Sequence, residues 1–210
     1  AIMAAVDLFK INVTGRGGHA ASPHYTSDPL IATVSIASAI QTIISSNLYQ
    51  REKAVCSITQ FHAGTTHNVI DETAYLSGTS RKFDQKERAM IRRRIEEFAE
   101  GQASSYNCRA EVTLTEGYPA TVNNPEKTDF AAEVAKQVAG EAAVNSSAAV
   151  DLGAEDFSYM LAARPGAYLF LGQGEGAGLH TADFDFNDEI SPYGESFFVR
   201  LVETAQHVDI

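Results

Sequence analysis

The chain has 210 residues, of which 44% are hydrophobic and 20% charged, and its formal net charge at pH 7 is −11. This length is sufficient for one large domain or two small ones, and the acidic balance excludes a nucleic-acid-binding surface, which needs a basic stripe. The two cysteines are too few for a disulfide framework or a cysteine-based zinc site, and they favour a reducing, cytoplasmic compartment.

The charge is distributed unevenly along the chain. The first 118 residues carry equal numbers of acidic and basic side chains, so the whole negative excess lies in residues 119–210. We therefore expect the two halves to do different jobs. A concentrated acidic half fits either a cation site or a solvated acidic surface, and composition leaves both interpretations open.

The first half of the chain predicts a regular series of strands and helices. Residues 6–14 alternate between apolar and polar side chains, as in a strand, and lead into a glycine turn at 15–18. The pair Asp28–Pro29 begins a helix that ends near Asn47. The apolar stripe of this helix consists of Leu30, Val34, Ala37, Ile40 and Ile44. Polar residues interrupt the run, which excludes a membrane span.

Three strands and a second helix complete this half. The strands are predicted at 54–61, 73–81 and 109–115, and the helix begins at the capping box formed by Asp84 and Glu87. The order β-α-β-β-α-β is that of the ferredoxin-like fold, in which an antiparallel sheet has two helices on one face. We therefore expect an α+β domain of this type over residues 6–117.

The second half, residues 118–210, predicts a less complete set of elements. After a linker at 118–125, one helix starts at Asn124–Pro125 and another covers 192–205. The short apolar run at 167–171 is typical of a buried strand. One strand cannot form an independent sheet, so this half is interpreted as the end of a larger α/β domain.

Three polar side chains of the first half are candidates for ligand binding. His19 directly follows the glycine turn, which would hold its imidazole toward a ligand; a surface histidine is the alternative. Asn68 and Arg81 lie at the beginning and at the end of a hairpin-like segment, residues 68–81. A guanidinium and an amide together suit the capture of a carboxylate, and an exposed arginine with a turn asparagine is the alternative.

The second half offers two acidic or imidazole-bearing segments. Glu155 and Asp156 follow Gly153, and paired carboxylates can serve as base, metal ligand or helix N-terminal acids. His180 precedes the densest acidic stretch of the chain, at 183–189. A neutral imidazole is the commonest metal ligand, and nearby acids can fix its tautomer.

The segments that carry these residues follow one another in the order of a single enzyme family. They are residues 15–21, 23–24, 28–29, 64–70, 76–81, 118–123, 153–158, 178–180 and 184–189. Together they resemble the aminoacylase and hippurate hydrolase family of co-catalytic metallopeptidases, and they cover nearly the whole chain. The ordered set is specific, although each segment alone is not.

The resemblance implies an architecture for the intact protein. A ferredoxin-like lid, which is also the homodimerisation domain, would be inserted into a zinc-peptidase-like α/β catalytic domain. Residues 6–117 resemble that lid, and residues 118–210 resemble the C-terminal part of the catalytic domain. Two family motifs of the N-terminal catalytic half, His-x-Cys-Gly-His-Asp and a Glu-Glu pair, do not occur in this sequence.

The resemblance also assigns roles to the candidate residues. His180 would be a metal ligand, and His19 would reach the active site of the neighbouring subunit and polarise the scissile carbonyl. Asn68 and Arg81 would hold the substrate carboxylate, also across the dimer. Two further residues would contribute to the substrate site: Gly153 would offer its backbone, and Glu155 would lie beside the metals.

We therefore expect a fragment of a metal-dependent amidohydrolase that cleaves N-acyl or N-aroyl amino acids, similar to hippurate hydrolase. The intact enzyme would hold two divalent metal ions per active site, with zinc as the first choice and manganese, cobalt or nickel as alternatives. One histidine cannot hold a catalytic metal, so this chain alone is expected to be inactive. The alternative is a non-catalytic ferredoxin-like module that dimerises or binds a small acid.

Overall fold

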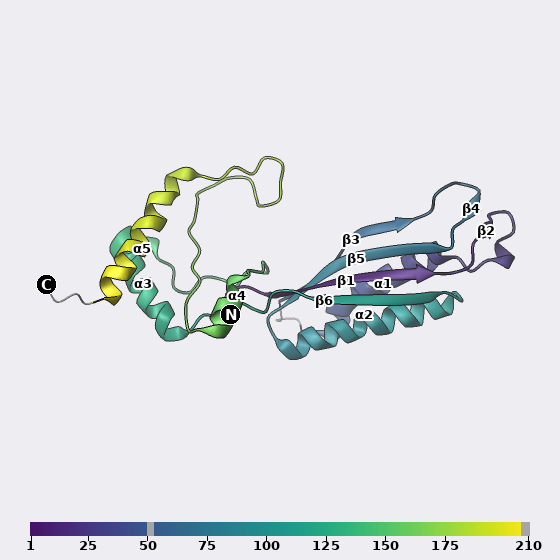
Figure 1. Cartoon of the computed structure of the whole chain (residues 1–210), viewed down its shortest axis with the longest axis horizontal. Coiled ribbons are helices and arrows are strands. Elements are labelled where there is room, and N and C mark those ends of the chain that lie inside the picture. Colours follow the sequence, from purple (N-terminus) through teal and green to yellow (C-terminus); the bar gives the residue numbers. More distant parts are fainter. Residues whose placement is uncertain (50–52, 207–210) are drawn as a thin grey trace. The chain divides into compact units, whose positions relative to one another are not determined.

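A computed structural model describes residues 1–49 and 53–206. The chain forms two compact units (Figure 1). The first, called the sheet unit, consists of Met3–Thr121 together with Val150–Ser158. The second, called the helical unit, consists of Val122–Ala149 and the chain from Tyr159 onward. Residues 150–158 therefore pack with the sheet unit, although residues 122–149 separate them from it in sequence.

Four antiparallel strands form the main sheet of the sheet unit. In spatial order they are β3 (Ala54–Ala63), β5 (Thr73–Lys82), β1 (Ala5–Thr14) and β6 (Arg109–Glu116). The register of β1 and β5 runs from the pair Ala5–Lys82 to the pair Thr14–Thr73. Because β3 lies on its other side, β5 is hydrogen-bonded along both edges. The four predicted strands are confirmed, each extended by one or two residues.

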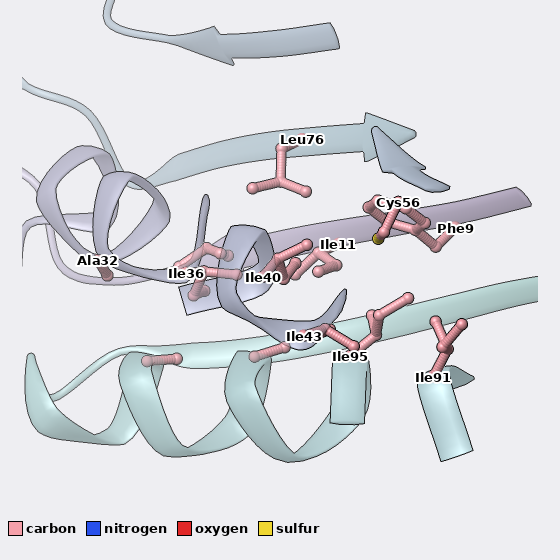
Figure 2. Packing of buried hydrophobic residues seen from close by; sticks show 13 residues of the cluster. Phe9, Ile11, Ala32, Ile36, Ile40, Ile43, Cys56, Leu76, Ile91 and Ile95 are labelled. Atoms are coloured by element: carbon pink, nitrogen blue, oxygen red, sulfur yellow. The ribbon is translucent and has the colours of Figure 1, made fainter. Parts of the chain in front are cut away.

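Two helices cover one face of this sheet and close the core. α1 (Pro29–Asn47) and α2 (Gln85–Ser105) each begin after an aspartate whose side chain accepts N–H bonds from the first turn. Figure 2 shows sheet side chains directed toward isoleucines of both helices. The cluster includes Phe9, Ile11 and Leu76 from the sheet, Ile36, Ile40 and Ile43 from α1, and Ile91 and Ile95 from α2. The predicted succession strand-helix-strand-strand-helix-strand is confirmed.

The buried face of α1 matches its predicted stripe only in part: Ile40 is fully buried, and Ala37 and Ile44 pack against the core. Leu30 and Val34 are 37% and 45% exposed, whereas Ile36 and Ile43 are fully buried. The predicted stripe is wrong at the first two positions because no residue of α1 is charged, so no charged face marks the solvent side. α1 is long and apolar enough to cross a membrane by length and composition only, a test that core helices of globular proteins also pass, and its inner side is part of the core.

A buried ion pair connects α2 with strand β1 of the sheet. Arg88, near the start of α2, is 4% exposed and donates to both carboxylate oxygens of Asp7 on β1, at 2.8 and 2.7 Å. Its Nη1 lies 3.1 Å from the Glu116 carboxylate on β6. This bidentate geometry compensates for the removal of both charges from water. Asp7 pairs with Ser80, so the ion pair lies at the Arg81 end of β5.

The helical unit contains fewer regular elements. They are α3 (Pro125–Ala139), most of α4 (Phe157–Ala163) and α5 (Ser191–Ala205), with α3 packed against α5. The helices predicted from Asn124–Pro125 and over 192–205 are confirmed. The strand predicted at 167–171 is wrong: among the described residues this segment pairs with no strand, and Leu169, Phe170 and Leu171 are 41–52% exposed. The backbone of Tyr168 is instead hydrogen-bonded to a side chain: its carbonyl accepts from Nδ2 of Asn123, and its N–H donates to Oδ1 of Asn123, both at 2.9 Å.

Candidate functional site

A small β-ribbon brings His19 next to Asn68. β2 (Gly18–His19) pairs with β4 (Val69–Ile70), and the Ala20 N–H donates to the carbonyl of Asn68 at 3.1 Å. The two strands approach closely because Gly17 has no side chain: a Cβ there would lie 2.6 Å from the Ile70 carbonyl oxygen. The turn glycines therefore permit the contact that joins these two candidate residues.

The hydrogen bond at His19 defines its tautomer. The backbone N–H of Ala21 donates to Nδ1 of His19 at 3.0 Å. A nitrogen that accepts a hydrogen bond carries no proton, so in the neutral imidazole the proton is on Nε2. The side chain is exposed. His19 therefore presents an N–H donor to a ligand, which is the group needed to polarise a carbonyl oxygen.

Arg81 lies beside a different candidate segment, the one that contains Gly153. Its Nη1 donates to the carbonyl oxygen of Leu152 at 3.0 Å. The Gly153 N–H donates to the Asp151 carboxylate, and the Gly153 carbonyl accepts from the Ala4 N–H at 2.9 Å. Gly153 was expected to offer its backbone to a substrate, but both its N–H and its carbonyl have hydrogen-bond partners within the chain. The carbonyl oxygen can still accept one more hydrogen bond with its second lone pair.

Glu155 shows the geometry of a helix N-terminal acid. Its carboxylate accepts the N–H of Phe157, the first residue of α4, at 3.4 Å, and its carbonyl accepts the N–H of Ser158. Glu155 is half-buried and Asp156 is exposed. A carboxylate at this position is favoured by the helix dipole, and it remains in the segment that Arg81 contacts.

Asn68 and Arg81 are far apart within one chain. Arg81 pairs with Val6 at one end of the sheet, whereas Asn68 immediately precedes β4, near the end of β5 that begins at Thr73. β5 has 10 residues, and at about 3.3 Å per residue its ends are roughly 30 Å apart. A single small carboxylate cannot contact both side chains of the same chain.

His180, in the helical unit, has an uncommon backbone conformation. Its φ is 65°, in the left-handed region that favours glycine. The turn is closed by Thr181, whose N–H and hydroxyl both donate to the Gly178 carbonyl, at 3.3 and 2.7 Å. Within the part of the chain that the structure describes, no three His, Cys, Asp or Glu side chains are placed to hold a metal ion. His180 alone does not form a metal site.

One residue near the candidate site was missed by the sequence analysis. Asp151 contacts Gly153 and shapes the segment that Arg81 binds. The signal was present, because an aspartate two residues before a glycine is typical of a turn in which the side chain accepts a backbone N–H.

Comparisons with known proteins place this chain in a family. The model of peptidase family M20/M25/M40 matches residues 8–204. A hippurate hydrolase of Campylobacter jejuni is 32% identical over 201 residues, which cover 96% of this chain and 52% of that protein. An N-acetyldiaminopimelate deacetylase of Enterococcus faecalis is 37% identical over 195 residues, covering 92% of this chain and 51% of that protein.

The solved structures include a close match in fold. The crystal structure of a Bacillus subtilis protein described as a dinuclear metal binding peptidase superposes with a TM-score of 0.74 and 27% identity, covering 97% of this chain and 51% of that one. The chain thus spans about half the length of the relatives it matches. The extent of the match and the order of the motifs lead to one conclusion: the chain belongs to peptidase family M20/M25/M40.

Proposed function

We propose that the chain is part of a metal-dependent amidohydrolase that cleaves N-acyl or N-aroyl amino acids. The observation that carries this proposal is the tautomer of His19, whose exposed Nε2–H is a donor for the carbonyl oxygen of an amide. The hippurate hydrolase and deacetylase relatives support the same reaction class. Hydrolysis of such an amide releases a carboxylic acid and a free amino acid.

Substrate binding is divided between two groups of residues. We assign the substrate carboxylate to Arg81, beside Leu152 and Gly153, because a guanidinium fork matches a carboxylate. Asn68 lies with His19 at the other end of β5, so these two residues serve a second active site. Each site then combines Arg81 of one chain with His19 and Asn68 of another, and Asn68 supplements the guanidinium across the dimer.

This arrangement requires a homodimer, which we assign to a ferredoxin-like lid over residues 6–117. The surface of α1 supports self-association. All of its 19 residues are uncharged, and Leu30, Ile31 and Val34 are 37–46% exposed. An apolar face without charge can meet its own copy around a twofold axis with no like-charge repulsion.

The described residues alone do not form a complete metal site. We therefore assign the remaining metal ligands to the rest of the longer protein of which, by this proposal, the chain is a part. Catalytic sites use about three protein ligands per metal, and His180 is one imidazole. We propose two divalent ions per site, by analogy with the dinuclear Bacillus subtilis relative, with zinc ahead of manganese, cobalt and nickel. Glu155 would lie near them.

A cytoplasmic location agrees with the state of the two cysteines. Cys56 and Cys108 are both free thiols. Burial raises the pKa of Cys56 to about 11, which keeps the thiol protonated and unreactive at neutral pH.

The first experiment assays the longer protein against a panel of N-acyl amino acids, with metal analysis of the same sample. Hydrolysis with about two bound divalent ions is expected. Binding of these acids, or dimerisation alone, without hydrolysis by the metal-loaded protein would instead favour a non-catalytic module. The 210-residue chain by itself is expected to be inactive, and metal-dependent hydrolysis by it would overturn the ligand argument.

The second experiment tests whether His19 acts on the partner subunit. Longer proteins carrying His19→Ala or His180→Ala are each expected to be inactive alone, and mixing them is expected to restore part of the activity. In the mixed dimer, one site has intact His180 and receives His19 from the other chain. If subunit exchange is verified and activity stays at the level of the separate variants, the assignment of His19 to the partner's site is wrong.

A further inference from the structure

A three-residue turn holds the carbonyl group to which Arg81 is bound. The Asp151 carboxylate accepts the N–H of Gly153, which closes an Asx turn around Leu152. The Leu152 carbonyl, at the centre of this turn, accepts the bond from Arg81 at 3.0 Å. Asp151 and Arg81 are therefore connected through one backbone group.

The turn is also fixed to the start of β1. The Ala4 N–H lies 3.2 Å from the Asp151 carbonyl oxygen and 2.9 Å from that of Gly153, and Met3 forms a parallel bridge with Asp151. A Cβ on Gly153 would lie 2.6 Å from the Asp151 carboxylate and 2.8 Å from the methyl carbon of Met3. Backbone bonds to Ala4 hold the turn from outside, and the bond from the Gly153 N–H to the Asp151 carboxylate holds it from within.

The orientation of Arg81 matters because carboxylate binding is directional. A guanidinium has five N–H donors in a rigid plane, and a bidentate pair uses two parallel ones. The bond to Leu152 occupies one donor and fixes the plane of the group. Without that anchor, a long side chain must lose more rotamer freedom when it binds a ligand, which weakens binding.

We propose that Asp151 is a positioning residue for the substrate carboxylate: it braces the turn whose Leu152 carbonyl orients Arg81. This inference rests on the proposed function of Arg81. Asp151 itself does not touch the substrate, and its negative charge is not required. Asparagine keeps the same acceptor atom and can close the same turn.

The kinetic test compares Asp151→Ala, Asp151→Ser and Asp151→Asn in the longer protein. With N-acyl amino acids, Asp151→Ala is expected to raise KM about threefold to tenfold, the effect of one hydrogen bond, and to change kcat by less than about twofold. Substrates whose carboxylate is replaced by a carboxamide should show no change. Asp151→Asn should match the wild type, and Asp151→Ser should fall between. Asp129→Ala, which removes an exposed carboxylate of α3, is the control.

Two kinetic outcomes would overturn the proposal. An Asp151→Asn variant as impaired as Asp151→Ala would mean that the charge, and not the turn, is what matters. Equal losses for acid and carboxamide substrates would mean a general structural role. The series remains decisive if the alanine variant does not fold, because the serine and asparagine variants retain acceptors of different reach.

A second readout separates this inference from the proposed function. In the 210-residue chain, Asp151→Ala is expected to accelerate hydrogen exchange of the Gly153 amide by about tenfold or more, whereas Asp151→Asn leaves it near the wild-type rate. Unchanged exchange in Asp151→Ala would overturn the brace directly. If exchange responds as expected but the wild-type longer protein hydrolyses no N-acyl amino acid, the proposed function fails and the described turn stands.

Discussion

The two units of this chain differ in how completely they bury their apolar side chains. The sheet unit contains a continuous core in which α1, α2 and the strands meet (Figure 2), and this core includes Leu76 and several isoleucines that are fully buried. In the helical unit, the described apolar residues classed as buried are Ala131 and Val134 of α3. Phe198, Val199 and Val202 of α5 are 56–65% exposed.

From this difference we predict that the sheet unit can fold on its own. Burial of apolar surface is the main favourable term in folding, and the sheet unit obtains it from its own elements. The helical unit leaves large apolar side chains in water, an arrangement typical of a surface that another segment covers. The curated relatives that this chain matches are about twice its length.

The largest expected effect is the removal of the buried ion pair in the sheet unit. Asp7→Ala leaves the Arg88 guanidinium buried without its main partner and is expected to lower the free energy of unfolding by about 3–5 kcal/mol. Urea denaturation of the 210-residue chain measures this. The matched control replaces both residues, Asp7→Leu with Arg88→Met, and should recover much of the loss. If Asp7→Ala alone is as stable as the wild type, the ion pair does not contribute to the stability of the fold.

A slightly smaller effect on stability is expected from truncating an apolar side chain, and it should differ between the two units. Ile40→Ala empties a fully buried position of α1 and is expected to cost about 2–5 kcal/mol. Phe198→Ala, at a position 65% exposed, should change the stability of this chain by less than about 0.5 kcal/mol. In the longer protein Phe198→Ala should become clearly destabilising. Equal costs of Phe198→Ala in both proteins would contradict the idea that α5 is covered by additional chain.

The smallest expected effect concerns binding by the sheet unit. Arg81→Lys keeps the charge but loses the guanidinium fork, so KM for substrates with a free carboxylate should rise by the equivalent of about 1–3 kcal/mol. Carboxamide analogues should be unaffected. Steady-state kinetics of the longer protein on matched pairs of substrates provides the measurement. An equal loss for both members of each pair would assign Arg81 a structural role only.

Local signals in the sequence predicted most of the sheet unit. Alternation located the strands, and the aspartates Asp28 and Asp84 located the starts of α1 and α2. The first two positions of the predicted stripe of α1, Leu30 and Val34, were wrong because the sequence of α1 lacks charges on every side. The run at 167–171 has the composition of a strand, but strand formation depends on a partner that composition does not reveal.

The candidate site depended more on tertiary structure. The six proposed residues were chosen by motif. Local bonds hold some of them, such as the bond from the Ala21 N–H to His19, but the contacts that bring Asn68 and Arg81 beside other candidates come from distant parts of the chain. The contact between His19 and the Asn68 segment requires a ribbon of two-residue strands, too short to produce a periodic pattern. The bond between Arg81 and Leu152 joins residues 71 positions apart, which no local pattern indicates.

The length of β5 has a mechanical consequence for the His19 turn. A strand that is hydrogen-bonded along both edges cannot shorten or bend easily, so it acts as a lever arm whose anchored end is Arg81. With an arm of roughly 30 Å, a rotation of about 10° at that end carries the His19 imidazole through roughly 5 Å. For the role proposed for His19, a rotation of this size at the Arg81 end would move the imidazole by more than the length of one hydrogen bond.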